Sequence, residues 1–248
     1  MKKPEIEVCA YSLESCRAAL EAGADRVELC AGPYEGGTTP SAGMIRMARE
    51  MLKDRQLYVM IRPRGGDFLY TDTEYELMRR DILSAKENGV DGIVTGILTA
   101  EGRVDVARTG ELVRWAAPMK VTFHRAFDMT RDYREALEDV VRTGCYRILT
   151  SGQRNTVNEG REILGEIVKL AAGRIRIMAG SGINAANARE IALLGVDALH
   201  LSGKSRRDSA MVFRNPAVAM GGIPGIPEYE IVYSDKEKIR EVVEKFGY

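Results

Sequence analysis

The sequence predicts a single (β/α)8 barrel, or TIM barrel, over residues 1–248. Three observations lead to this fold class. Short runs rich in β-branched residues alternate eight times with amphipathic runs, no linker interrupts the alternation, and the 248 residues match the roughly 250 that such barrels commonly use as one domain. A doubly wound sheet is the alternative, but that architecture rarely needs eight regular units.

The predicted strands are short, mostly apolar runs. In chain order they cover residues 6–9, 26–30, 57–62, 92–98, 120–124, 147–151, 174–180 and 198–202. The segments between them carry apolar residues at helical spacing, which predicts amphipathic helices. These helices cover residues 12–22, 41–53, 72–88, 105–116, 132–143, 158–171 and 184–194.

An eighth helix is expected to close the barrel at residues 235–246, where Ser234 and Glu237 have the spacing of a capping box. Its apolar face consists of Ile239, Val242, Val243 and Phe246. A glycine also follows several predicted helices, at the position that favours a left-handed C-terminal cap. These glycines are Gly23, Gly89, Gly144 and Gly195.

Charge and composition exclude several classes of function. Lys plus Arg and Asp plus Glu each total 36, so the net charge is zero, whereas proteins that bind nucleic acid or anionic membranes usually carry a basic excess. The N-terminus has no apolar signal-peptide core, and no run approaches the ~20 apolar residues that span a bilayer. The four cysteines are too sparse for a disulfide framework. We expect a cytoplasmic protein with no nucleic-acid or membrane partner.

Strand alternation predicts an unusually polar barrel interior. The aliphatic set of each strand should face the helices, so the other set faces inward. The inward residues are Glu7, Cys9, Glu28, Cys30, Met60, Arg62, Thr122, His124, Arg176, Met178, His200 and Ser202. Because buried charges persist only when they are paired, we expect Glu7 and Glu28 to bond with Arg62 and Arg176.

Several of these side chains stand at the carboxyl ends of strands, where barrel enzymes place their chemistry. They are Cys9, Cys30, Arg62, His124 and His200. The loops at the same end add Arg64 and Asp67 after the third strand, Asp128 after the fifth, and Ser151 after the sixth. After the seventh strand, a turn containing Gly180 and Ser181 is expected to lead into a helix N-terminus, which would make an anion site.

The connection between the last strand and the last helix, residues 203–234, is long for a compact barrel. We expect it either to cover the mouth of the barrel or to pack against a second subunit.

Several segments together resemble the CutC copper-homeostasis family. They cover residues 7–9, 23–30, 36–41, 59–68, 122–128, 147–152 and 180–184, and the IRPRGGDF and TFHRAFD segments are highly specific. One departure is Ser181, where the family often has glycine. The resemblance implies a TIM barrel, a cytoplasmic and usually oligomeric protein, and a role in copper handling. It also implies that Cys9 and Cys30 are ligands of Cu(I).

The residues themselves support a copper site. Cys9 and Cys30 end adjacent strands, which lie ~4.7–4.9 Å apart, and thiolates are the soft ligands that Cu(I) prefers. A nearby cation such as Arg62 would favour the thiolate form. Two cysteines so placed could instead simply pack, or form a disulfide under oxidation. We interpret Cys16 and Cys145 as structural.

The alternative function is an enzyme of unassigned reaction that acts on a small phosphorylated or carboxylated substrate. Its catalytic residues would be Glu28, His124 and Asp128, with Glu28 or His124 as general base. Its anion-binding residues would be Arg62, Arg64, Asp67, Ser151, Gly180, Ser181 and His200. No lysine ends a strand, which argues against a Schiff-base aldolase. The expected partners are a copper ion or a small anion and further copies of the chain, as a dimer or tetramer, with no organic cofactor.

Overall fold

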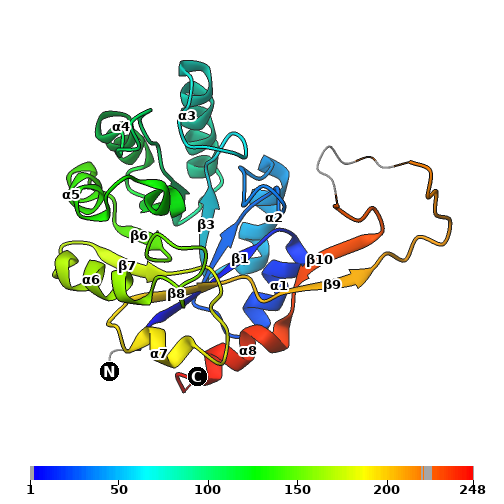
Figure 1. Ribbon diagram of the computed structural model, residues 1–248. Coiled ribbons are helices and arrows are strands. Elements are labelled where there is room, and N and C mark those ends of the chain that lie inside the picture. Colours follow the sequence, from blue (N-terminus) through cyan, green and yellow to red (C-terminus); the bar gives the residue numbers. More distant parts are fainter. Residues whose placement is uncertain (1–2, 219, 221–224, 248) are drawn as a thin grey trace.

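Eight parallel strands form a closed barrel in the computed structural model (Figure 1). The structure describes residues 3–218, 220 and 225–247. Each strand pairs with its neighbours along the sequence, and β1 pairs with β8 to close the sheet. The strands are β1 (Glu5–Ala10), β2 (Arg26–Leu29), β3 (Gln56–Met60), β4 (Gly92–Thr95), β5 (Lys120–Phe123), β6 (Arg147–Thr150), β7 (Arg176–Ala179) and β8 (Ala198–Leu201). The prediction of a TIM barrel is confirmed.

Helices surround the barrel, one after each strand (Figure 1). They are α1 (Leu13–Glu21), α2 (Ala42–Leu52), α3 (Asp72–Glu87), α4 (Val106–Ala116), α5 (Tyr133–Thr143), α6 (Arg161–Ala171), α7 (Ala188–Ala192) and α8 (Lys236–Glu244), with a 3-10 turn η1 (Arg125–Met129) after β5. Within the described part of the chain, no helix is long and apolar enough to cross a membrane.

The seventh helix is much shorter than the predicted segment 184–194. The Asn184 and Asn187 side chains explain this, because they satisfy backbone groups in a turn. Asn187 Oδ1 accepts the Asn184 N–H at 2.9 Å, and Asn184 Oδ1 accepts the Ala186 N–H at 2.9 Å. Asparagine side chains compete with a helix in this way, so α7 begins only at Ala188.

The cap predicted at the end of α5 is present in the structure, whereas the cap predicted at the start of α8 is not. Gly144 ends α5 in the left-handed conformation, at a φ of 81°. The predicted capping box at Ser234 is wrong, because Ser234 ends strand β10 and donates its N–H to Ser15 Oγ at 3.0 Å. Asp235 caps α8 instead, accepting the N–H of Glu237 at 2.9 Å.

The apolar core lies between the barrel and the ring of helices. Aliphatic side chains on the outer face of the strands, such as Val27, Leu29 and Ile93, are buried against helix residues such as Ile45 and Ile82. Inside the barrel, beside the polar residues, apolar side chains form two clusters with fewer members than the core. These interior groups include Tyr58, Met60 and Val94 around the cysteines, and Leu149, Met178 and Ala198 on the other side.

Residues 203–234 contain an antiparallel hairpin, which the sequence analysis expected only as an extended loop. Strand β9 (Lys204–Asp208) pairs with β10 (Glu230–Ser234), and we call this hairpin, with the described residues of its connecting loop, the arm. The arm extends outward, away from the barrel, past α1 and α2 (Figure 1). It exposes large apolar side chains, namely Met211, Val212, Phe213, Val218 and Met220. Of the two expected placements, this direction favours contact with another molecule.

Candidate functional site

A layer of ion pairs fills the lower part of the barrel. Glu7 is fully buried, and Arg26 Nε donates to its carboxylate. His200 Nδ1 lies 2.8 Å from Glu7 Oε1, and Arg147 Nη1 lies 3.9 Å from Glu7 Oε2. Arg26 also bonds with Glu5 at 2.9 Å. Burial by itself raises the pKa of Glu7, but the charge of Arg26 and the hydrogen bond with His200 outweigh it and hold that pKa far below its usual range.

The predicted pairing of Glu7 and Glu28 with Arg62 and Arg176 is wrong. Arg176 is partly exposed, and its nearest carboxylate contact is Glu5 at 4.0 Å. The register explains the true pairs, since Glu7 lies opposite Arg26 on one side and His200 on the other. Alternation along β2 also places Arg26 on the inward face with Glu28, so the sequence pattern does indicate Arg26 as a buried cation.

Arg62 binds backbone carbonyls in place of a glutamate. Its Nη1 donates to Glu35 O at 2.7 Å and to Gly37 O at 2.9 Å, and its Nη2 donates to Gly66 O at 2.8 Å. Arg62 therefore fastens the loop after β2 to the loop after β3. The side chain is buried, and it contacts the ring of Phe68 at 5.0 Å from the ring centroid.

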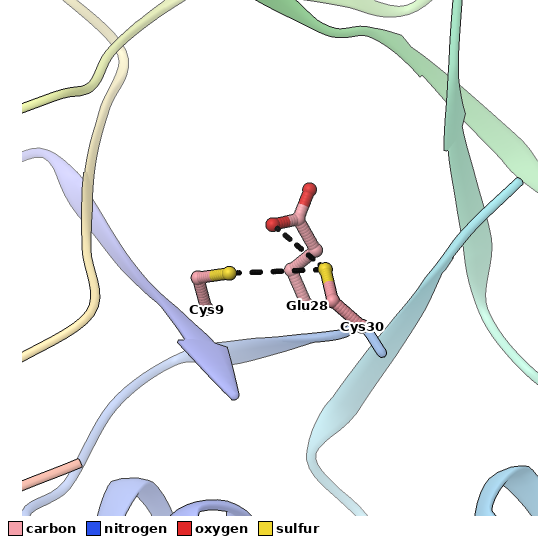
Figure 2. A group of neighbouring side chains, drawn as sticks. All are labelled: Cys9, Glu28 and Cys30. Atoms are coloured by element: carbon pink, nitrogen blue, oxygen red, sulfur yellow. Dashed lines mark hydrogen bonds between the residues drawn. The ribbon is translucent and has the colours of Figure 1, made fainter. Parts of the chain in front are cut away.

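Above the ion layer, Cys9, Glu28 and Cys30 form what we call the sulfur cluster (Figure 2). The Cys9 and Cys30 Sγ atoms lie 3.7 Å apart, and Cys30 Sγ lies 3.6 Å from Glu28 Oε2. All three side chains are buried, and one donor atom from each lies within 4.8 Å of the others. Parallel pairing of β1 with β2 places Cys9 opposite Glu28, and the chain then returns Cys30 to the same inward face.

The three groups of the sulfur cluster shift one another's pKa values. The hydrogen bond from Cys30 is the largest influence on the Cys9 thiol and, together with His200, holds its pKa well below the usual value against the effect of burial. Burial and the Cys9 charge raise the pKa of Cys30, and the same two causes raise that of Glu28. Of the three groups, Cys9 is the one whose pKa is shifted toward the charged form. His200, and not the expected Arg62, is the cation that stabilises it.

The carboxyl ends of the strands open into a cavity of about 830 Å³. Six of the residues predicted for the site contribute to its lining: Cys9, Glu28, Arg62, His124, Ser181 and His200. Cys30 is fully buried and is not part of the described cavity lining. The cavity lining also includes Tyr11, Phe68, Lys204, Lys238 and Glu241, which the sequence analysis did not single out. No sequence motif includes all five residues, because Lys204 lies in the arm and Lys238 and Glu241 lie in α8, far along the chain from the other two.

Arg64 and Asp67 are not part of the described cavity lining. Arg64 Nη2 bonds with Asp67 Oδ1 at 2.9 Å, and Arg64 Nε bonds with Glu74 Oε1 at 2.6 Å. The Asp67 side chain is 71% exposed. These groups close the loop after β3 on the surface, and the acidic partners already occupy the guanidinium that was expected to bind an anion.

Asp128 and Ser151 join two loops and likewise do not contribute to the described cavity lining. Asp128 Oδ2 accepts the Ser151 hydroxyl at 2.9 Å and pairs with Arg125 Nε at 2.7 Å. Backbone N–H groups of Ser151 and Gln153 donate to the same carboxylate at 3.1 Å. With this many partners, Asp128 holds the loops after β5 and β6 together.

The turn after β7 differs from the expected anion site. Ser181 has a φ of 76°, in the left-handed region that favours glycine, and its hydroxyl donates to Asn155 O at 2.5 Å. The turn does not run into a helix N-terminus, since α7 begins at Ala188. Gly180 serves packing, because a Cβ there would lie 2.5 Å from Leu149 Cδ1 and 3.3 Å from the Cβ of His200.

His124 directly follows β5 and is 4% exposed. Burial and the charge of Arg62 lower its pKa to about 3, so the imidazole is neutral at physiological pH. Its Nδ1 accepts the N–H of Ala126 at 3.2 Å, and the centre of its ring lies 4.9 Å from that of Phe68, with the two ring planes tilted by 54°. His124 is thus placed in the cavity wall as expected, but in a form that carries its proton on Nε2.

Comparison with known proteins identifies the family of this chain. A family model described as the CutC family matches residues 4–205, which include the whole barrel and its cavity-forming strands. The chain belongs to the CutC family. A relative from Bacteroides fragilis, named as a CutC family protein, is 48% identical over 245 residues, which cover 98% of each chain. The resemblance found in the sequence is confirmed.

Two further CutC relatives extend the comparison. A human protein named copper homeostasis protein cutC homolog is 44% identical over 236 residues, which cover 95% of this chain and 86% of its own. A CutC protein of known crystal structure, from Streptococcus agalactiae, is 36% identical with a TM-score of 0.76, covering 80% of this chain and 98% of that chain.

Proposed function

We propose that this CutC protein serves copper homeostasis by binding Cu(I) through Cys9 and Cys30 in the cytoplasm. The observation that carries the proposal is the pair of sulfur atoms 3.7 Å apart, one of them in the cavity wall. A single ion that entered the cavity would reach both thiols without a rearrangement of the strands. The name of the human relative, a copper homeostasis protein cutC homolog, supports the same assignment.

The donor set fits Cu(I) better than Zn²⁺. Thiolates are soft ligands, which Cu(I) favours, and two of them satisfy its low coordination number. Zinc in structural sites takes four ligands from cysteine, histidine or carboxylate. The sulfur cluster offers two sulfurs and one carboxylate among the described residues, and the neighbouring His200 imidazole is already paired with Glu7 at 2.8 Å.

An anaerobic competition titration against a chromophoric Cu(I) chelator tests the proposal. Wild-type protein should bind one Cu(I) tightly, and the Cys9→Ser, Cys30→Ser double variant should lose this binding. The matched control is the Cys16→Ser, Cys145→Ser double variant, which removes two buried thiols from other parts of the fold. Weak binding by the wild type, or equal losses in both double variants, would refute the assignment of the ligands.

An enzyme is the second candidate, and the size of the cavity favours it. A volume of about 830 Å³ lies in the range of small-molecule sites, roughly 300–1,000 Å³, and is far larger than an ion needs. The chain would then act on a small anionic substrate with Glu28 in the cavity wall as the acid or base.

We also propose that the chain forms a homo-oligomer, a dimer or a tetramer, through the arm. The arm exposes five large apolar side chains of residues 211–220, and exposed apolar patches commonly mark interfaces. Sedimentation velocity of the whole chain and of a chain without residues 209–229 tests this. The shortened chain should sediment as a monomer, and an unchanged assembly would refute the role of the arm.

A further inference from the structure

The cavity wall contains buried polar groups that the copper site does not use. His124 Nε2 has no hydrogen-bond partner within the described part of the chain. A neutral imidazole has one acceptor nitrogen, and Ala126 occupies it at Nδ1. Nε2 therefore carries a hydrogen that donates to nothing. A buried donor without a partner is rare in proteins and calls for an explanation such as a ligand.

Arg62 supplies a second unused donor beside it. Its Nη1 and Nη2 are bonded to backbone carbonyls, but among the described residues its Nε makes no hydrogen bond. The Tyr70 hydroxyl lies near this guanidinium and is itself buried. The ring of Phe68 contacts both side chains, at 5.0 Å from the Arg62 guanidinium carbon and 4.9 Å from the centre of the His124 ring.

The orientation of the imidazole is fixed by its surroundings. A Cβ on Gly96 would lie 2.8 Å from His124 Nδ1 and 2.9 Å from Cε1, so this edge of the ring packs directly on the backbone of Gly96. The neighbouring Ala126 binds the same edge. The opposite edge carries Cδ2 and Nε2, and Nε2 is buried in this structure. His124 is a preorganised hydrogen-bond donor.

The charges around the cavity favour an anion. The cations Arg62, Arg125, Lys204 and Lys238 contribute to its lining together with His200, whose pKa is raised, and they outnumber the acidic groups Glu28, Glu241 and Cys9. Phosphate is less suited than a carboxylate, because phosphate sites draw on several donors and commonly on a helix N-terminus. Here the Ser181 hydroxyl is bonded to Asn155 O, and the turn does not enter a helix. Two side-chain N–H groups match the oxygens of one carboxylate.

We propose that the cavity binds a small organic acid, whose carboxylate accepts hydrogen bonds from His124 Nε2 and Arg62 Nε after the Phe68 side chain turns away. The backbone of Phe68 can stay in place during this movement, because its carbonyl oxygen accepts the Leu98 N–H at 2.9 Å. The site goes beyond copper binding and deepens the second candidate function, since it names the substrate class of an enzyme that would use this cavity. It does not depend on the two thiols.

A nuclear magnetic resonance titration of metal-free protein with lactate tests this site, with inorganic phosphate as the contrasting probe. Lactate should bind saturably and shift the Nε2 resonance of His124, and phosphate should bind more weakly. His124→Phe keeps a ring but has no donor, and should weaken lactate binding by at least about tenfold, the factor expected for one hydrogen bond to a charged group. His124→Gln keeps a side-chain N–H and should restore part of the affinity.

Each other outcome counts against the site. No saturable lactate binding, or undiminished binding in a folded His124→Phe variant, overturns it. Phosphate that binds as tightly as lactate overturns the carboxylate class. Phe68→Ala should bind lactate at least as well as the wild type, and weaker binding overturns the covering role of that ring. The Cu(I) titration is a separate measurement on the same wild-type protein, so a failure of the copper site and a failure of this site are distinguishable.

Discussion

Replacing Arg26 with methionine removes one cation from the ion layer at the bottom of the barrel. Arg26 is 1% exposed, and its loss leaves the fully buried Glu7 with His200 at 2.8 Å and Arg147 at 3.9 Å. Removing one partner of a buried ion pair costs roughly 3–5 kcal/mol. Because two cations remain beside Glu7, we expect the lower end, a loss of about 3 kcal/mol in the free energy of unfolding at pH 7.

The loss should depend on pH with a definite sign. In the folded protein the pKa of Glu7 lies far below its usual value of 4.5. A carboxyl group whose pKa is lowered by folding contributes stability that is present above its unfolded pKa and is lost as the pH falls toward the folded pKa. Arg26→Met weakens this contribution. The difference between the variant and the wild type should therefore be complete at neutral pH and shrink on acidification below about 4.5.

Urea unfolding, followed by the fluorescence of the single tryptophan Trp115 and by circular dichroism, measures both effects. The matched control is Arg174→Met, which breaks an exposed pair with Glu138 at 2.7 Å. Exposed pairs contribute about 0–1 kcal/mol, so the control should lose little. A loss below about 1 kcal/mol for Arg26→Met, or a loss no larger than that of the control, would refute the ion layer as a source of stability.

Two further predictions follow from particular contacts. Gly96→Ala places a Cβ 2.8 Å from the His124 imidazole and should lower the free energy of unfolding by about 1–3 kcal/mol. The control Gly165→Ala in α6 meets only an ordinary contact at 3.8 Å and should be neutral or stabilising. Equal free energies for the two variants in urea unfolding would contradict the packing of His124 on Gly96. Iodoacetamide at pH 7 should alkylate Cys9 before Cys145, since the Cys9 pKa is lowered and that of Cys145 is raised to about 12. Mass spectrometry that finds Cys145 modified at least as fast would contradict the thiolate at Cys9.

The sequence by itself determined the architecture and the direction of the important side chains. Eight alternations of short apolar runs with amphipathic runs leave few ways to fold other than the closed barrel. Within each strand, side chains alternate between faces, so the inward positions of Cys9, Cys30 and His124 followed from local patterning alone. Local patterning also located the carboxyl ends of the strands, where the cavity opens.

Only the tertiary structure decided which inward groups meet. Alternation fixes the face of a side chain but not its height relative to the next strand, and that register paired Glu7 with Arg26 and His200 rather than with Arg62. Arg62 and Asp128 look like free chemical groups in the sequence, but the folded loops surround them with backbone and side-chain partners. These pairings depend on residues far apart in the chain, whose distances are set when the sheet closes, and no local pattern encodes them.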